Sequence, residues 1–364
     1  MSGVISAAWR TEPRPLLTEY LAVRPVHSDS RSRYFAAGSM AALAGATPAT
    51  SAALAASTTI ARITPDLDLS VHIGSLVLET PVMPASGCFG PELGRLIPMD
   101  ELGASVTKTV FAEARGGNAA HRLTEIPAGM VNSVGIPSSG AAGYLAAQHP
   151  AYLALGVPVI ISVGGHRHNE YAPLVVELNG AGEAYELNVS CPNLDREGTA
   201  IGADPDELAR VVADVRRVTT KPLIVKLPSM LSSITDCAQA AEDAGADALC
   251  VANSLPALAL DPRTGAPLLG NVMGGLSGPS IRPVALRLVW LASRAVEIPV
   301  IGCGGIEHPD DALEFFAAGA KAVQIGTASF ARPSAAVDIA RGLRDQCRIA
   351  GIGSVAELVG ARAR

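Results

Sequence analysis

The sequence has few aromatic residues, no run of basic residues and no long apolar segment. Only 4% of its 364 residues are aromatic, while glycine numbers 36 and proline 26. This composition suits helices packed on a sheet with tight turns, rather than a sandwich of stacked aromatic rings. The formal net charge is −6, and no aromatic residues are interleaved with Lys or Arg. These absences exclude nucleic-acid binding as the function.

The cysteines provide no metal centre within this chain. No two of them have a C-x-x-C or similar ligand spacing, so we expect neither zinc nor an iron–sulfur cluster. Several lie in apolar runs, where a free cysteine behaves as a small hydrophobic residue, and this favours a reducing cytoplasm. The six cysteines are Cys88, Cys191, Cys237, Cys250, Cys303 and Cys347.

The first 64 residues differ in composition from the rest of the chain. They are rich in Ala, Ser, Thr, Arg and Pro without sustained periodicity, and the Ala-rich stretch 36–61 is too interrupted to span a membrane. We expect residues 1–64 to form an irregular, poorly ordered extension and residues 65–364 to form one catalytic domain. A targeting segment stays open as an alternative, although Glu12, Glu19 and Asp29 oppose a transit peptide.

Eight short apolar runs follow from Asp66 onward, with helix-like segments between them. In one such segment, 203–218, Asp204 can cap the helix and Pro205 stands in its first turn. In another, 308–319, Pro309 stands in the first turn. This alternation predicts an α/β fold, a (β/α)8 TIM barrel with an N-terminal β-hairpin, with a doubly wound open sheet as the alternative. The runs are 80–87, 102–110, 157–165, 183–190, 221–228, 244–253, 298–305 and 318–326.

Polar residues stand at the carboxyl ends of these runs, which in a barrel meet at one catalytic mouth. Lys108 and Lys226 end two of the runs without matching acids, so we expect an anionic ligand. Glycine-rich segments at 274–278, 302–306 and 325–329 follow the late strands, where barrels bind phosphate. The sequence contains no P-loop and no G-x-G-x-x-G after a strand, so binding of ATP or NAD by those folds is not supported.

The segment ELNVSCPN at 186–193 ends the fourth run at a cysteine between a serine and a proline. Pro192 takes the chain out of the strand, so we expect Cys191 on a loop above the mouth, whereas Cys250 and Cys303 belong to the core. The seven histidines lie in no recognisable partner motif of a thiol hydrolase. Cys191 is therefore a candidate general base, and a nucleophilic role beside a spatially close histidine stays open.

Eight motifs in order along the chain resemble those of the dihydroorotate dehydrogenases, which are FMN-dependent (β/α)8 barrels of pyrimidine biosynthesis. The resemblance extends from Asp66 to about Pro333 and implies oxidation of dihydroorotate to orotate by hydride transfer to FMN. The residues after VKLP and after VANS depart from the family pattern. The motifs are VTKT, PAGMVNSVGI, ELNVSCPN, VKLP, VANS, GGLSGP, PVIGCGGI and QIGTA.

Three of these motifs also imply a class within the family. A cysteine at position 191 marks the soluble class 1, and PAGM and GGLSGP are more similar to its B type. The B type works with a subunit that holds FAD and a [2Fe–2S] cluster and passes electrons to NAD. The partnerless A type, which uses fumarate, agrees equally with the lack of cluster spacing. The resemblance implies a homodimer or, with the second subunit, a heterotetramer.

The resemblance assigns a role to each site residue. Cys191 would take the proton from C5 of dihydroorotate while hydride leaves C6 for the flavin. The substrate would be held by Lys108, Asn132, Gly135, Ile136, Asn188, Asn193, Asn253 and Ser254. The flavin ring would be contacted by Ala85, Ser86, Gly87, Lys108, Asn188 and Lys226, and the FMN phosphate by Gly278, Gly304, Gly305, Gly326 and Thr327. Amide side chains suit a uracil-like ring because they both donate and accept hydrogen bonds.

Three other functions stay open. One is a related flavin barrel acting on another dihydropyrimidine. Another is a lyase or aldolase barrel that uses Lys226 as a Schiff base and binds a phosphorylated sugar through the glycine loops. The third is a flavin-binding homologue without turnover.

Overall fold

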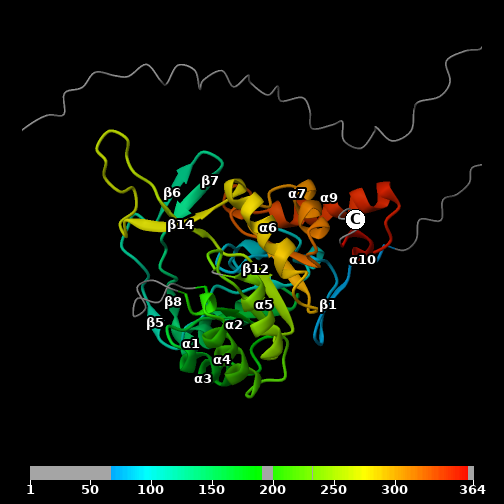
Figure 1. Cartoon of the computed structure of the whole chain (residues 1–364), viewed down its shortest axis with the longest axis horizontal. Coiled ribbons are helices and arrows are strands. Elements are labelled where there is room, and N and C mark those ends of the chain that lie inside the picture. The colour runs from blue at the N-terminus through cyan, green and yellow to red at the C-terminus, as the bar shows by residue number, and fades with distance from the viewer. Residues whose placement is uncertain (1–66, 191–199, 232, 360–364) are drawn as a thin grey trace, which may run out of the picture. The chain divides into compact units, whose positions relative to one another are not determined.

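An eight-stranded parallel sheet forms the centre of the structure, a computed structural model that describes residues 67–190, 200–231 and 233–359 (Figure 1). All eight expected runs contain a strand of this sheet, in the spatial order β3-β16-β15-β12-β11-β10-β9-β4. Nearly every strand residue is buried, as expected of parallel strands covered on both faces. The strands are β3 (Val82–Pro84), β4 (Ser105–Val106), β9 (Val159–Val163), β10 (Ala184–Asn188), β11 (Leu223–Lys226), β12 (Ala248–Val251), β15 (Val300–Cys303) and β16 (Ala322–Ile325).

The sheet closes on itself between β3 and β4. These strands are the two ends of the hydrogen-bonded order, and the Gly103 amide donates to the Val82 carbonyl at 2.9 Å across the remaining gap. A side chain at Gly103 would collide with the carbonyl oxygen of Thr80, so this close approach requires glycine. The predicted (β/α)8 barrel is confirmed, and the open sheet is wrong.

Helices surround the barrel (Figure 1), and the residues that the longer helices bury are mainly apolar. In α4 the Asp204 side chain accepts from the Asp206 and Glu207 amides and Pro205 occupies the first turn, as predicted. Turns η1 (Leu93–Arg95) and η2 (Met99–Glu101) follow β3. The α-helices are α1 (Gly140–Gly143), α2 (His149–Leu153), α3 (Tyr171–Glu177), α4 (Pro205–Arg216), α5 (Ile234–Asp243), α6 (Arg282–Ala292), α7 (Pro309–Ala317), α8 (Ala328–Ala331), α9 (Ala335–Ala350) and α10 (Val355–Leu358).

Smaller antiparallel sheets are added to the barrel. The expected N-terminal hairpin is present as β1 (Val71–Ile73) and β2 (Leu76–Leu78). A four-stranded sheet, in the order β13-β14-β7-β6, lies at one end of the barrel (Figure 1). It is built from two insertions, one after β4 and one after β12. The strands are β6 (Leu123–Ile126), β7 (Gly129–Asn132), β13 (Leu255–Leu258) and β14 (Met273–Ser277), and β5 (Ala114–Arg115) pairs separately with β8 (Ser138–Ser139).

The glycine-rich segment 274–278 differs from its expected form. We expected a loop after the sixth strand, but Gly274–Ser277 lies within β14 and only Gly278 follows the strand. The strand forms because β14 pairs with β7 and β13, which are distant in the sequence. Short glycine-rich strands are specified by such pairing and not by local preference.

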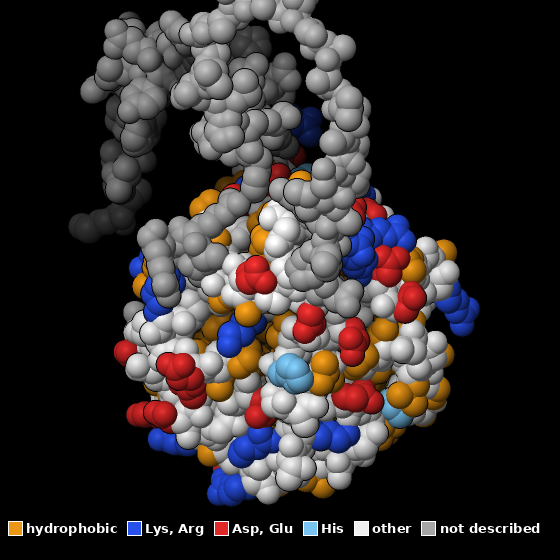
Figure 2. All heavy atoms as spheres, turned by 90° about the vertical axis from the view of Figure 1, so that its right-hand side faces the viewer, with side chains coloured by type: hydrophobic (Ala, Val, Ile, Leu, Met, Phe, Trp, Pro, Cys, Tyr) orange, Lys and Arg blue, Asp and Glu red, His pale blue; other side chains and the backbone are white. Residues whose placement is uncertain are grey.

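The described part of the surface carries charged side chains of both signs (Figure 2). On the face in Figure 2, Lys and Arg side chains are interspersed with Asp and Glu, and no broad basic surface is visible there. No described helix is long and apolar enough to cross a membrane. The extension 1–64 and its boundary lie outside the described residues, so that division of the chain stays a prediction.

Candidate functional site

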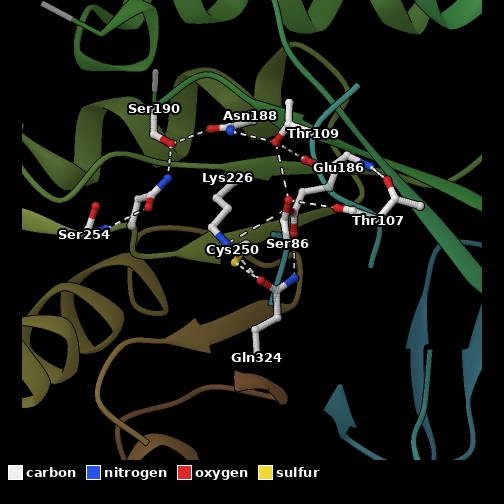
Figure 3. Close-up of polar contacts among 12 residues, drawn as sticks. Ser86, Thr107, Thr109, Glu186, Asn188, Ser190, Lys226, Cys250, Ser254 and Gln324 are labelled. Atoms are coloured by element: carbon white, nitrogen blue, oxygen red, sulfur yellow. Dashed lines mark hydrogen bonds and ion pairs between the residues drawn. The ribbon is translucent and has the colours of Figure 1, made fainter. Parts of the chain in front are cut away.

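A continuous series of hydroxyl and amide side chains crosses the carboxyl ends of the barrel strands (Figure 3). Ser86, just after β3, donates to the Thr107 carbonyl at 2.9 Å and lies 3.4 Å from the Thr109 hydroxyl. Asn188, at the end of β10, donates from Nδ2 to that same hydroxyl at 3.0 Å. Ser190 in turn donates to Oδ1 of Asn188 at 2.6 Å. The structure thus brings Ser86 and Asn188, predicted from separate strands, into one hydrogen-bonded series.

The series continues to the end of β12. Asn253 donates from Nδ2 to the Ser190 hydroxyl, and its Oδ1 accepts from the Ser254 amide at 2.8 Å. These two contacts fix the orientation of the Asn253 amide. Its second N–H and second lone pair can then serve a ligand that both accepts and donates hydrogen bonds. We call this series the polar row; it consists of Ser86, Thr109, Asn188, Ser190, Asn253 and Ser254.

Asn132 reaches the polar row from the four-stranded sheet. It ends β7 opposite Gly275 of β14, and its Nδ2 donates to the Gly275 carbonyl at 3.2 Å. A side chain on Gly275 would collide with the Ser254 hydroxyl, and one on Gly274 would collide with the Asn132 carbonyl. The two glycines therefore let Asn132 and Ser254 approach the same point.

Two predicted substrate residues, Gly135 and Ile136, are not joined to the row. Gly135 and Ile136 lie in the loop after β7 with φ values of +75° and +44°. No hydrogen bond in the described ranges joins them to the row, and a side chain at Gly135 would meet Asn118. Cys191 and Asn193 lie outside the described residues, which end before this loop at Ser190. The roles of all four stay predictions.

Lys108 is a half-buried cation that follows β4. Its backbone amide lies 3.4 Å from the Tyr152 hydroxyl. Burial lowers the pKa of the Lys108 ammonium, and the positive charge of Arg122 lowers that pKa further. Both effects penalise the charged form, and an anion bound beside Lys108 would offset them. A carboxylate is a suitable ligand for this position.

The predicted phosphate residues are close to one another, and we call them the glycine cradle. A Cβ built on Gly305 would lie 2.7 Å from the Gly278 carbonyl oxygen, and one on Gly278 would lie 3.6 Å from Cγ2 of Thr327. The φ values of Gly278, Gly304 and Gly305 are +97°, +132° and +76°, which L side chains rarely adopt. Small residues after the late strands of a barrel leave backbone N–H groups open to a phosphate. The cradle consists of Gly278, Gly304, Gly305, Gly326 and Thr327.

The predicted flavin-ring residues after β3 border both the cradle and the lysines. A Cβ on Gly326 would lie 3.6 Å from Cβ of Ala85 and 3.5 Å from Sγ of Cys88. Burial raises the pKa of Cys88 to about 11, although the charges of Lys226 and Lys108 oppose that rise. A Cβ built on Gly87 would meet no neighbouring atom within 4 Å. The space beside Cys88 is therefore shared by the cradle and both lysines.

A charged layer lies inside the barrel near the row (Figure 3). The Lys226 ammonium donates to Oε1 of Gln324 at 3.1 Å, and Nε2 of Gln324 donates to Oε2 of Glu186 at 2.5 Å. The Cys250 thiol donates to the same Gln324 oxygen at 3.3 Å. We call these four residues the interior layer. Burial lowers the pKa of Lys226, but the neighbouring side chains of Cys250, Cys303 and Glu186 raise it by more.

Sequence reasoning missed several of these residues. No role was predicted for four residues that lie inside the sequence motifs named above, namely Glu186, Gln324, Thr109 and Ser190. Strand alternation is the signal that could have found two of them, because Glu186 shares a strand face with Asn188 and Gln324 shares one with Gly326. A charged or amide residue on the inner face of a barrel strand is unusual enough to require a function.

The fold and the site together define a class of protein, a (β/α)8 barrel enzyme with polar side chains and glycine-rich turns at the carboxyl ends of its strands. Residues 68–347 match the dihydroorotate dehydrogenase family, and the chain belongs to that family. It is 46% identical over 297 residues to the catalytic subunit of dihydroorotate dehydrogenase B (NAD(+)) from Trichlorobacter lovleyi, which covers 80% of this chain and 98% of the relative. The corresponding subunits of Pelobacter propionicus and Geotalea daltonii are 44% and 43% identical over 298 residues, covering 81% of this chain and 98% of each relative. The resemblance inferred from the motifs is confirmed.

Proposed function

We propose that the chain is the catalytic subunit of a B-type dihydroorotate dehydrogenase and oxidises dihydroorotate to orotate in pyrimidine biosynthesis. The observation that carries this proposal is the convergence of Asn132 with Asn188, Asn253 and Ser254 of the polar row at the barrel mouth, within a chain of this family. The three amide side chains, those of Asn132, Asn188 and Asn253, come from the ends of three different strands and suit a ring that presents alternating N–H and C=O groups. Lys108 supplies the cation for the ring carboxylate.

FMN is the flavin that fits the site. The glycine cradle would hold its phosphate, since the positive φ values and close backbone contacts of Gly278 and Gly305 exclude side chains there. When bound, FMN supplies a two-electron acceptor for hydride. Its ring would be contacted by Ala85, Ser86, Gly87, Lys108, Asn188 and Lys226.

The chain's own residues position the substrate and move its proton. The polar row and Asn132 orient the ring, and Lys108 neutralises its carboxylate. Cys191 would accept the proton from C5, a step that needs a base on the ring face opposite the hydride acceptor. Asn193, Gly135 and Ile136 complete the proposed substrate set.

The interior layer disfavours the lyase alternative. A Schiff base forms from a neutral amine, which requires a lysine with a lowered pKa. The pKa of Lys226 is instead raised, and its ammonium donates to Gln324. Lys226 is therefore suited to a fixed positive charge, not to nucleophilic attack.

We also propose an electron-transfer partner for the chain and a cellular location. We infer a separate subunit with FAD and a [2Fe–2S] cluster that passes electrons to NAD, giving a heterotetramer, or a homodimer where that subunit is absent. A cytoplasmic location is supported by the free thiols of the described cysteines, which suit a reducing compartment.

The test is anaerobic reduction of the reconstituted flavoprotein. The purified full chain is incubated with FMN, desalted and mixed with dihydroorotate without oxygen. We expect a bound flavin spectrum that bleaches as orotate forms. A chain that takes up no FMN, or whose flavin stays oxidised, contradicts the proposal. Reduction by another dihydropyrimidine alone would support the related-barrel alternative.

A further inference from the structure

The interior layer contains a carboxylate that the proposed reaction does not use. Glu186 is completely buried, with 0% of its surface exposed, and it comes from the middle of β10. Its Oε2 accepts from Gln324, whereas its Oε1 has no hydrogen-bond partner among the described residues and lies 4.0 Å from the Lys226 ammonium. A buried carboxylate with an unsatisfied oxygen is costly, so its persistence calls for a role.

Gln324 connects Glu186 to Lys226 in a fixed orientation. Its amide N–H donates to Glu186, so its carbonyl must face the other way, toward Lys226 and the Cys250 thiol. Gln324 Oε1 is the one hydrogen-bond acceptor of the Lys226 ammonium in the described part of the chain. An ammonium has three N–H donors, so the others are available to a ligand.

Lys226 ends β11 in register with Asn188 of the polar row, which ends the neighbouring strand β10. The charge of Lys226 acts on Cys88, and Cys88 borders Gly326 of the glycine cradle. Burial raises the pKa of the Cys250 thiol well above its usual value. That thiol is neutral at pH 7, and Glu186 is the carboxylate paired with Lys226, with its Oε1 4.0 Å from the ammonium.

We propose that Glu186 and Gln324 are positioning residues that direct the Lys226 ammonium at the flavin ring, and that the charge of Glu186 holds down the flavin reduction potential. This inference rests on the proposed flavin site. A cation beside a flavin favours its reduced form, which carries more negative charge, and a carboxylate 4.0 Å behind that cation cancels part of its field. Gln324 keeps the two charges from forming a direct pair that would draw Lys226 away from the ring.

Two substitutions should therefore shift the potential in opposite directions. Glu186→Gln removes the carboxylate charge and leaves the Lys226 charge uncompensated, so the flavin potential should rise. Gln324→Leu removes the link and lets Lys226 pair directly with Glu186, so the potential should fall. We expect each change to alter the equilibrium constant for flavin reduction about tenfold, or about 30 mV for two electrons.

The experiment measures the midpoint potential of full-length, FMN-loaded protein by anaerobic dye equilibration. Glu207→Gln is the matched control, because Glu207 is a nearly buried carboxylate on α4 with a salt bridge to Arg210, and it should leave the potential unchanged. The dissociation constants of oxidised FMN and the melting temperatures are measured alongside. A residue that acts only on stability would change the melting temperature without opposite shifts in potential.

The results separate this inference from the proposed function. If the parental chain binds no FMN or is not reduced by dihydroorotate, the proposed function fails and this inference with it. If the parental flavin is reduced normally but the variants keep its potential, only this inference is overturned. If Glu186→Gln does not fold, Gln324→Leu is a sufficient test by itself, because it retains the charges of both Lys226 and Glu186. A lowered flavin potential in Gln324→Leu then supports the inference. An unchanged or raised potential contradicts it.

Discussion

Asn188 donates from Nδ2 to the Thr109 hydroxyl at 3.0 Å, and this hydrogen bond joins the fourth strand of the barrel to the loop after the second. The same hydroxyl lies 2.9 Å from that of Ser162 and 3.4 Å from that of Ser86. Thr109 therefore fixes the orientation of the Asn188 amide, although it was not among the predicted site residues. Thr109 is thus a buried member of the polar row that orients part of it through Asn188.

Replacing Thr109 with the isosteric valine should weaken substrate binding more than it weakens the fold. The change leaves Asn188 without its acceptor, a loss of about 1–2 kcal/mol, so we expect the KM for dihydroorotate to rise about tenfold. Steady-state kinetics on the FMN-loaded protein measure this. Ser105→Ala is the control, because Ser105 is buried on β4 with a hydroxyl that has no hydrogen-bond partner. Equal KM values for the two variants would contradict the role of Thr109.

Cys191→Ala should leave FMN bound and orotate affinity nearly unchanged, because the row and Lys108 hold the ring. It should slow flavin reduction by roughly two to four orders of magnitude, since the proton at C5 loses its base. Stopped-flow absorbance under anaerobic conditions measures the rate. Cys191→Ser should keep some activity with an optimum at higher pH, because a hydroxyl is a weaker acid than a thiol. Parental rates in Cys191→Ala would show that the base lies elsewhere.

Gly305→Ala should reduce FMN affinity strongly. Its new Cβ would lie 2.7 Å from the Gly278 carbonyl oxygen, at a φ of +76° that disfavours alanine. Gly265→Ala is the matched control, because Gly265 has a similar φ of +71° but no atom within 4 Å of its Cβ position. Both variants carry the backbone penalty, and only Gly305→Ala disturbs the cradle. Fluorescence titration of apoprotein with FMN should show at least a tenfold higher dissociation constant for Gly305→Ala alone, about 1.4 kcal/mol.

The salt bridge of Glu101 should make stability depend on pH. Arg341 donates to Glu101 from Nε at 2.9 Å and from Nη2 at 2.6 Å, and Arg344 lies 3.5 Å away. The hydrogen bonds from Arg341 lower the pKa of Glu101 below its usual 4.5. The stabilisation is therefore present above pH 4.5 and is lost as the pH falls through the lower pKa of the folded state.

Glu101→Gln tests this dependence by urea unfolding at pH 7 and at pH 3. We expect a loss of up to about 1 kcal/mol at pH 7 and a smaller loss at pH 3, because the parental carboxylate is then becoming protonated. The exposed Glu79→Gln serves as control and should show little change at either pH. A difference between parent and variant that stays the same at both pH values would exclude the salt bridge as its cause.

A chain that starts at Thr64 should fold and bind FMN like the full chain. The described core begins soon after this point, where the Asp68 amide donates to the Gly353 carbonyl at 2.8 Å and Leu69 is buried. Circular dichroism and flavin content compare the two proteins. Insoluble or flavin-free truncated protein would show that the first 63 residues contribute to the fold.

Much of the architecture could be predicted because its signals are local. Most barrel strands are short apolar runs after Gly-Ala or proline, and Asp204 and Pro205 mark the start of α4 by side-chain capping and a fixed φ. The asparagines at the strand ends could be found for the same reason, since parallel strands of a barrel deliver their carboxyl ends to one mouth. Strand β14 could not, because its glycines have no strand preference and pair only with distant partners.

The sequence by itself determined the barrel, the family and the residue types at the mouth, because apolar periodicity, turn residues and strand-end positions are properties of contiguous segments. Tertiary structure alone decided which of those residues meet. Asn132 approaches Ser254 through two glycines of another strand, and Glu186, Lys226 and Gln324 come from three strands that face one another only in the closed barrel. Their hydrogen bonds depend on distances across the barrel interior, which no local pattern in the chain encodes.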